Sequence, residues 1–119
     1  MTTQEIAARL VVLCRQGQFE TAQTELFSKD AISTEPYATP AFEKETKGLD
    51  AIIAKGHKFD SMVETMHLME VSEPLIATNS FSCTIHMEAT MKERGHMDMT
   101  ELCVYNIKDG KIIAETFYM

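Results

Sequence analysis

The sequence predicts an α+β domain in which three N-terminal helices pack on a curved, mainly antiparallel sheet. Apolar residues recur at helical spacing as far as about Ser61, and the period changes to alternation from Val63 onward. Turn signals then divide the alternating part into four segments. A length of 119 residues fits one domain, residues 1–119. We expect the layers to form a cone whose open end holds a small-molecule pocket.

The first two helices are expected to form a hairpin. Thr2 and Glu5 fit a capping box, and the apolar positions after them have helical spacing: Ile6, Leu10 and Leu13. Gly17 ends this helix, and a second amphipathic helix follows from about Phe19 to Phe27.

The middle of the chain predicts a brief strand, a loop and a third helix. Residues 31–36 are partly β-branched and end at Pro36, and the ten or so residues after them lack a clear period. The third helix begins after Gly48 and ends near Ser61, with an apolar set at Leu49, Ile52, Ile53, Gly56 and Phe59.

The last half of the chain predicts an antiparallel meander. Alternating patterns run over residues 64–73, 75–92, 97–107 and 111–118. The turns between them are expected at Glu73-Pro74, Glu93-Arg94-Gly95 and Asp109-Gly110.

Charge and composition exclude several classes of partner. The net charge is −7, and the 11 basic residues form no cluster, so nucleic acid and membrane surfaces are poor partners. The first residues lack the basic stretch and apolar run of a signal peptide, and no segment approaches the roughly 20 apolar residues of a membrane span. We therefore expect a cytoplasmic protein.

Neither the cysteines nor the histidines predict a metal or cofactor. The three cysteines are widely spaced, which favours buried thiols: Cys14, Cys83 and Cys103. No two of the four histidines have a helical metal spacing, and His86-Met87-Glu88 lacks the paired cysteines of a zinc deaminase. The nine methionines suggest a soft apolar pocket lining, or ordinary filling of the core.

Several local strings resemble the SnoaL-like polyketide cyclase group of the nuclear transport factor 2 and ketosteroid isomerase superfamily. They are Gly17 between two short helices, residues 26–31 leading to Glu35-Pro36, residues 48–52, residues 71–77 and residues 103–112. The resemblance implies a cystatin-like cone and a homodimer that packs sheet to sheet. This superfold hosts isomerases, cyclases, dehydratases and proteins without catalysis, so fold alone does not assign a reaction.

Glu35 is the first catalytic candidate. The resemblance places it where the isomerases carry a carboxylate general base before a proline, and a partly desolvated carboxylate can move a proton beside a carbonyl. The alternative is an exposed or turn-capping glutamate. The isomerases' oxyanion tyrosine corresponds to Leu10 and their protonated carboxyl to a position near Glu101, so steroid isomerisation is not expected.

Strand alternation supplies the remaining pocket candidates. It places Glu101, Cys103 and Tyr105 on one face, and it places Ile113, Glu115 and Phe117 together. If both sets face the cone, two inward carboxylates could divide acid and base roles. Alternatively, they pair with Arg94, a lysine or a backbone amide, or lie at a subunit interface. From the third helix, Phe59 and His57 are further candidates, and His57 can equally be an exposed helix residue.

Two functions follow from these residues. The first is binding of a small, largely apolar organic molecule, with isomerisation, cyclisation or dehydration by proton transfer through Glu35 and Glu101. The second is a ligand-binding or dimeric scaffold protein without chemistry, which the absent oxyanion tyrosine favours.

Overall fold

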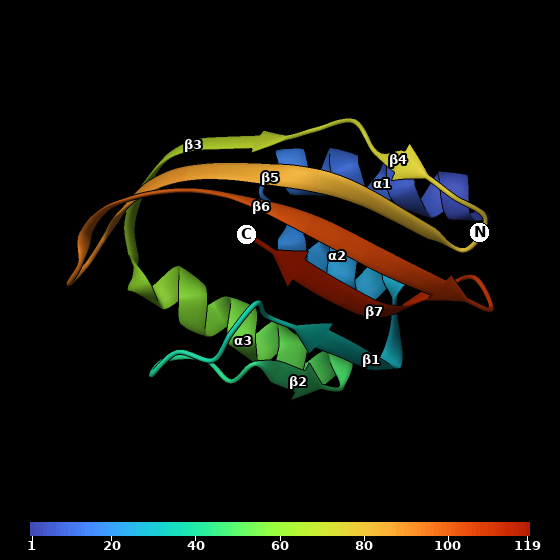
Figure 1. The fold of residues 1–119 in the computed structure, drawn as a ribbon, viewed down its shortest axis with the longest axis horizontal. Coiled ribbons are helices and arrows are strands. Elements are labelled where there is room, and N and C mark those ends of the chain that lie inside the picture. The colour runs from blue at the N-terminus through green and yellow to red at the C-terminus, as the bar shows by residue number, and fades with distance from the viewer.

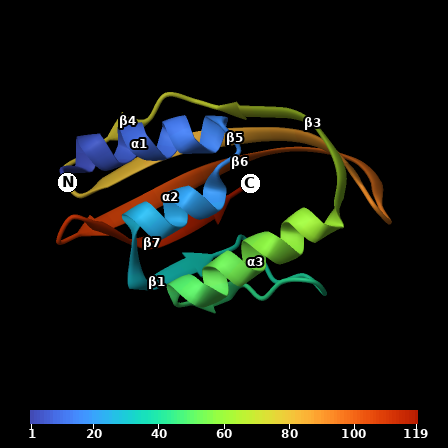
Figure 2. The same ribbon diagram turned by 180° about the vertical axis from the view of Figure 1, so that it is seen from behind.

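A computed structural model describes residues 1–119 and confirms the predicted α+β cone. The helices are α1 (Thr3–Arg15), α2 (Phe19–Leu26) and α3 (Leu49–Met62). The strands are β1 (Phe27–Thr34), β2 (Glu45–Lys47), β3 (Val63–Val71), β4 (Leu75–Ile76), β5 (Ser80–Met91), β6 (Gly95–Lys108) and β7 (Lys111–Tyr118). All three helices lie on one side of the curved sheet, which is seen from its outer side in Figure 1 and from the helix side in Figure 2.

The sheet order is β2-β1-β7-β6-β5-β3, with β4 paired to β5. Strands β3, β5, β6 and β7 form the predicted antiparallel meander. The pairing of β1 with β7 is parallel, and it places Ser33 beside Glu115. This single parallel pairing joins the helical first half of the chain to the edge of the meander.

The expected start of the chain is confirmed. The Thr2 side chain accepts a hydrogen bond from the Glu5 backbone, and the Glu5 carboxylate accepts one from the Thr2 backbone. Helix α1 ends before Gly17, whose φ of 72° lies in the left-handed region that glycine adopts without strain. The two helices therefore turn back on each other as the glycine position predicts.

The strands differ from the expectation in three ways. Strand β1 begins at Phe27, directly after α2, because Phe27 already has extended geometry and pairs with Ile112. Strand β2 was not predicted. The expected long strand over residues 75–92 is broken by residues 77–79, which carry the turn formers Thr78 and Asn79, and β4 folds back on β5.

The core lies between the helices and the concave face of the sheet. Helix α1 packs against β3, β4 and β5. Its apolar side shares one core with residues of β5 and β6, and this core includes Ile6, Leu10, Leu13, Phe81, Cys83 and Tyr105. The three cysteines are free and buried, as predicted. Cys83 and Cys103 are register partners on adjacent strands. No helix is both long enough and apolar enough to cross a membrane.

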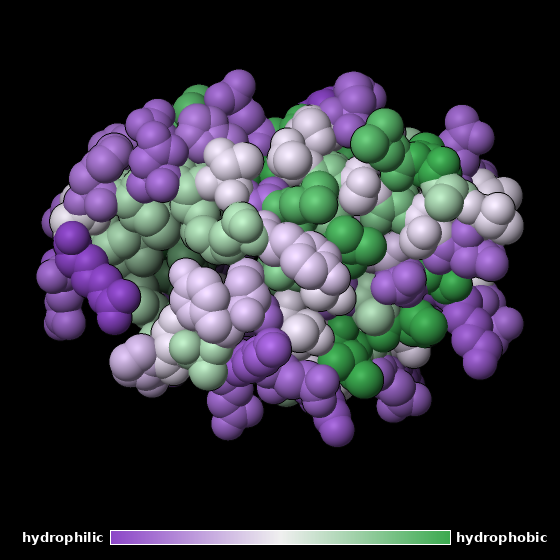
Figure 3. All heavy atoms as spheres, in the orientation of Figure 1, coloured by the Kyte–Doolittle hydropathy of each residue, from purple (hydrophilic) through white to green (hydrophobic).

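The open end of the cone lies beside the long strands. Strands β5 and β6 extend beyond the end of β7 and curl towards α3 (Figure 1). The space-filling view shows a hollow between these curled strands and α3, near the C-terminus (Figure 3). Met97 and Met99 of β6 pack against the core on this part of the sheet. The mouth of the cone is therefore partly apolar.

Candidate functional site

A cluster of polar side chains lies on the otherwise apolar concave face. Ser33 and Glu115 are the two polar residues that are almost fully buried, at 0% and 5% exposure. They are register partners in β1 and β7, so backbone pairing fixes their proximity. Such groups are costly to bury unless other polar groups satisfy them.

Lys55 of α3 reaches down to this pair. Its Nζ donates a hydrogen bond to Ser33 Oγ at 2.7 Å and lies 3.7 Å from Glu35 Oε2. The ammonium group also lies 5.7 Å from the centroid of the Phe117 ring. Helix α3 aims Lys55 at the sheet because it follows the fully buried Ile52 by three residues, which places both on one helix face. The lysine side chain is only 17% exposed.

Opposing effects act on the pKa of the Glu115 carboxyl group. Burial raises its pKa to about 7, because the charged form loses hydration. A hydrogen bond from the Ser33 hydroxyl and the charge of Lys55 lower this pKa, whereas the charge of Glu35 raises it. Ser33 therefore accepts from Lys55 and donates to Glu115, connecting the cation to the buried carboxyl.

Glu101 of β6 belongs to the same cluster. Burial is the main cause that raises its pKa to about 7, and the charges of Glu35 and Glu115 raise it further, while Lys55 opposes the rise. The charge of Glu115 raises the pKa of Glu101, so ionisation of Glu115 disfavours ionisation of Glu101. Near neutral pH each carboxyl is available in both its protonated and ionised forms, as a proton-transfer group requires.

Glu35 follows the end of β1 and precedes Pro36, as the sequence indicates. Its backbone N–H donates to the Lys44 carbonyl at 2.7 Å, which closes the loop between β1 and β2. The loop is held to α3 by Lys58, whose ammonium donates to the Ala41 carbonyl. The carboxylate of Glu35 is therefore positioned from both sides at the partly exposed edge of the cluster, with 26% of the side chain exposed.

Two further candidates lie deeper on the concave face. Tyr105 stacks on Phe81 with ring centroids 4.8 Å apart, and burial raises its pKa well above the usual value. Cys103 is fully buried, and a hydrogen bond with Cys83 together with burial raises its pKa. Both residues belong to the core that supports Glu115, because Tyr105 is the register partner of Glu115.

Phe117 and Phe59 lie nearer the polar cluster. Phe117 is partly buried and contacts Lys55, while Phe59 lies one helical turn after Lys55 and packs against the core. These rings supply apolar surface around the charged groups.

The structure places His57 outside this cluster. Its Nε2 lies 2.7 Å from Glu20 Oε1 of α2, and its side chain is 62% exposed. The physical reason is helix geometry, since His57 follows Lys55 by two residues and therefore projects from a different face of α3. Of the two sequence interpretations, the exposed helix residue is the one that matches this position.

Ile113 also lies elsewhere than strand alternation predicts. The register shifts by one residue between Asn106 and Ile107, so Ile112 pairs with Ile107 and becomes fully buried, while Ile113 is exposed. Such a bulge inserts one residue into one strand and resets the alternation after it. Glu115 and Phe117, which follow the bulge, face the cone.

The sequence interpretation missed Lys55 and Ser33. A signal for Lys55 was present, because a lysine at its position interrupts the apolar stripe of the third helix between Ile52 and Phe59. Ser33 carried no such signal, since a serine in a short strand is usually exposed. Leu10, which the resemblance aligns with the tyrosine of the isomerases, is buried in the core and offers no hydroxyl.

The chain resembles several solved structures. A proposed SnoaL-like polyketide cyclase from Mesorhizobium loti is 28% identical, with a TM-score of 0.92 over 100% of both chains. A cystatin-like protein of unknown function from Xanthomonas campestris is 16% identical, with a TM-score of 0.82 over 99% of this chain and 90% of the other. A protein from Catenulispora acidiphila with a ketosteroid isomerase-like fold, solved with trimethylamine, is 17% identical, with a TM-score of 0.69 over 99% and 87% of the two chains.

No curated protein sequence matches the chain. The family model that describes the SnoaL-like domain matches residues 1–119. With the cone fold and the matching structures, this assigns the chain to a family: it belongs to the SnoaL-like domain proteins.

Proposed function

We propose that the protein binds a small, largely apolar carbonyl compound at the mouth of the cone and transfers a proton on it, as an isomerase, cyclase or dehydratase does. One observation carries the proposal. Two carboxyl groups, Glu101 and Glu115, have pKa values raised to about 7 beside the ammonium group of Lys55. Proton transfer at neutral pH is most efficient when the acid and base groups titrate near that pH.

Glu35 and Glu101 act as base and acid in this proposal. One carboxylate removes a proton from a carbon next to the carbonyl, the electron pair of the C–H bond forms a carbon–carbon double bond, and the π pair of the carbonyl moves onto its oxygen. The other carboxyl returns a proton at a second position of the same molecule. Glu115 lies deeper and sets the charge of the cluster through Ser33 and Lys55.

Lys55 replaces the missing oxyanion tyrosine. A developing negative oxygen needs a hydrogen-bond donor or a positive charge that is already in place. The Lys55 ammonium is largely shielded from water and lies against the Phe117 ring, where a flat ligand would also pack. Its ion pair with Glu35 is 3.7 Å long, so a ligand oxygen can compete for the same ammonium group.

The apolar part of the ligand would lie against the methionine and phenylalanine side chains at the mouth. Met97, Met99 and Phe59 are partly buried there, and thioether groups adapt to irregular ligand shapes. Two matching structures were solved with small organic molecules, TerC with polyporic acid and the Catenulispora acidiphila protein with trimethylamine. Small-molecule binding in this fold is consistent with the proposal.

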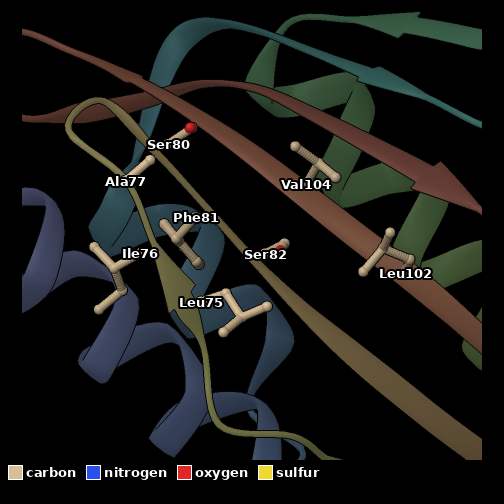
Figure 4. A pocket seen from close by; sticks show the side chains of 8 residues that line it. All are labelled: Leu75, Ile76, Ala77, Ser80, Phe81, Ser82, Leu102 and Val104. Carbon is tan, nitrogen blue, oxygen red and sulfur yellow. The ribbon is translucent and has the colours of Figure 1, made fainter.

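A homodimer is the second part of the proposal. Strongly hydrophobic side chains gather on the outer face of the sheet, over β4 and the adjoining parts of β6 and β7 (Figure 3). A groove of about 330 Å³ runs there between β4 and β6, lined among others by Leu75, Ile76, Leu102 and Val104 (Figure 4). Leu75 is 78% exposed, and an exposed apolar patch of this kind favours association. A second copy, related by two-fold symmetry, is the proposed occupant.

A protein without catalysis is the second candidate function. The polar cluster satisfies itself, because no buried side-chain nitrogen or oxygen lacks a hydrogen-bond partner. A self-satisfied cluster needs no ligand to be stable. In that case the cone serves as a binding module or as the scaffold of the dimer.

The experiment that separates these functions measures proton exchange on a ketone. The probe is 2-tetralone, an apolar enolisable ketone, and proton NMR in D2O follows the loss of its α-proton signal. Proton transfer predicts exchange above the buffer rate that Glu101→Gln and Glu35→Gln lose, while the control His57→Gln retains it. If the unaltered protein binds the probe without faster exchange, the non-catalytic function is favoured. Native mass spectrometry of the same preparation reports the dimer and any bound molecule.

A further inference from the structure

A second group of ionisable side chains lies on the outer face of the sheet, near the turn between β5 and β6. Glu88, His96 and Asp98 each offer one ligand atom, and these three atoms lie within 4.8 Å of one another. Glu88 and Asp98 are register partners, and His96 pairs with Thr90, two positions further along β5. The strand pairing therefore fixes the three side chains on one face.

His86 extends this group. Its Nε2 lies 2.8 Å from Asp98 Oδ1, and its Nδ1 lies 3.3 Å from Glu70 Oε1 of β3. His96 Nε2 lies 3.9 Å from Glu88 Oε1. Two imidazoles and three carboxylates therefore lie close together on the adjacent strands β3, β5 and β6. His86 pairs with Glu70 and Asp98, and His96 pairs with Glu88.

We propose that Glu88, His96 and Asp98, joined by His86, bind a divalent transition-metal ion, with Zn²⁺ as the best match. Imidazole nitrogen and carboxylate oxygen are the donors that Zn²⁺ takes alongside thiolate, and four ligands complete a tetrahedral site. Ligand atoms about 2.0–2.2 Å from a zinc ion are roughly 3.5 Å apart. The ligand atoms of Glu88, His96 and Asp98 lie within 4.8 Å of one another, so side-chain rotations have to bring them closer to bind the ion. The half-exposed side chains of His96 and Asp98 are free to make these rotations.

Glu70 supports the metal site without binding the ion. Its carboxylate contacts Nδ1 of His86. A carboxylate in this position keeps the ring proton on Nδ1, so the lone pair of Nε2 is the one that can bind a metal ion. Nε2 lies 2.8 Å from Asp98 Oδ1, so an ion bound by both atoms would take the place of this hydrogen bond. This arrangement orients a metal-binding histidine in advance.

The proposed metal site is separate from the concave cluster and from the outer groove. Asp98 precedes Leu102 by four residues on β6, or about 13 Å along an extended strand. Zinc binding can therefore be tested without disturbing the proton-transfer groups or the apolar surface.

The experiment is equilibrium dialysis of the full chain, without a histidine tag, against 10 μM ZnCl2, with metal and protein content measured by mass spectrometry. We expect one zinc ion per chain. His96→Ala and Asp98→Asn are expected to lower the affinity at least about tenfold. The control His57→Ala removes an exposed histidine elsewhere and is expected to bind like the unaltered protein.

Three outcomes overturn the proposal. They are no zinc binding by the unaltered protein, undiminished binding by His96→Ala and Asp98→Asn, or an equal loss in His57→Ala. Circular dichroism of each variant keeps the test interpretable, and the conservative change Glu88→Gln provides a second variant if one fails to fold. A cobalt-loaded sample adds a direct readout, because tetrahedral Co²⁺ absorbs visible light far more strongly than the hydrated ion.

Discussion

Lys55 Nζ lies 2.7 Å from Ser33 Oγ, and this hydrogen bond joins a helix to the one parallel strand pair of the sheet. Ser33 is the register partner of Glu115 and donates to its carboxylate. The charge of a lysine on α3 therefore reaches a buried carboxyl on the last strand through a single hydroxyl. The same ammonium group also contacts Glu35, so one cation balances the partly exposed and the buried side of the cluster.

Replacing Lys55 with methionine tests this arrangement. The lysine lowers the pKa values of Glu101 and Glu115, so both values are expected to rise above about 7 in Lys55→Met. The variant is expected to be less stable by about 1–3 kcal/mol at pH 8, where the carboxylates lose their partner, and less affected at pH 5. Carbon-13 NMR of the glutamate carboxyls measures the titrations, and urea unfolding measures the stability.

Lys47→Met is the matched control, because the Lys47 side chain is 73% exposed and forms its ion pair with Glu45, outside the cluster. Unchanged titrations of Glu101 and Glu115 in Lys55→Met would show that the lysine does not balance the cluster.

The stability of the protein is expected to fall as the pH rises from about 5 to 7.5. The pKa of Glu115 rises from 4.5 in the unfolded chain to about 7 in the fold. Between these values the folded state holds more protons than the unfolded state, so the free energy of unfolding decreases with pH. The contribution of this one carboxyl is about 1–3 kcal/mol. Urea unfolding at several pH values measures the slope.

Glu115→Gln separates this contribution from those of Glu101, whose pKa is also raised to about 7, and His86. A hydrogen bond with Asp98 raises the pKa of His86. A histidine whose pKa is raised in the fold also contributes less to the free energy of unfolding as the pH increases. Glu115→Gln is therefore expected to reduce the slope without abolishing it, and to be more stable than the unaltered protein at pH 8. Equal slopes for the two proteins would contradict the raised pKa of Glu115.

The regular parts of the fold could be predicted from sequence, and the irregular parts could not. The alternation of Glu101, Cys103 and Tyr105 indicates their face because β6 pairs with β5 without a register shift. Ile112 and Ile113 are both apolar, so no pattern shows which of them the bulge turns outward. The bulge depends on how β7 pairs with its neighbour.

Contacts between distant segments limited the prediction of the site in the same way. Ser33 and Glu115 are 82 positions apart, and only the parallel pairing of β1 with β7 joins them. His96 and Asp98 have no helical metal spacing, and they approach Glu88 through the hairpin register. Lys55 lies in the apolar stripe of its helix. Lysine side chains are usually exposed, however, so the residue type alone argues against a buried, functional position for Lys55.

The outer groove leads to a prediction about assembly. Leu75→Glu places a charge on the most exposed apolar side chain of the groove, and a charge buried in an interface is costly. We expect a dimer for the unaltered protein and a shift towards monomer, with at least a tenfold weaker association, for Leu75→Glu. Analytical ultracentrifugation over a range of concentrations measures both. Val12→Glu is the control, since Val12 is 44% exposed on α1, away from the groove.

Glu35→Gln gives the sharpest prediction about catalysis. The change removes a charge and barely alters shape, and the Glu35 backbone N–H keeps its bond to Lys44, so folding is expected to be intact. Because the charge of Glu35 raises the pKa of Glu101, that pKa is expected to fall in the variant. Loss of a positioned base lowers proton transfer by about 10²–10⁴-fold. A variant that shows the lower Glu101 pKa yet exchanges the ketone proton at the original rate would exclude Glu35 as the base and leave Glu101 as the remaining candidate.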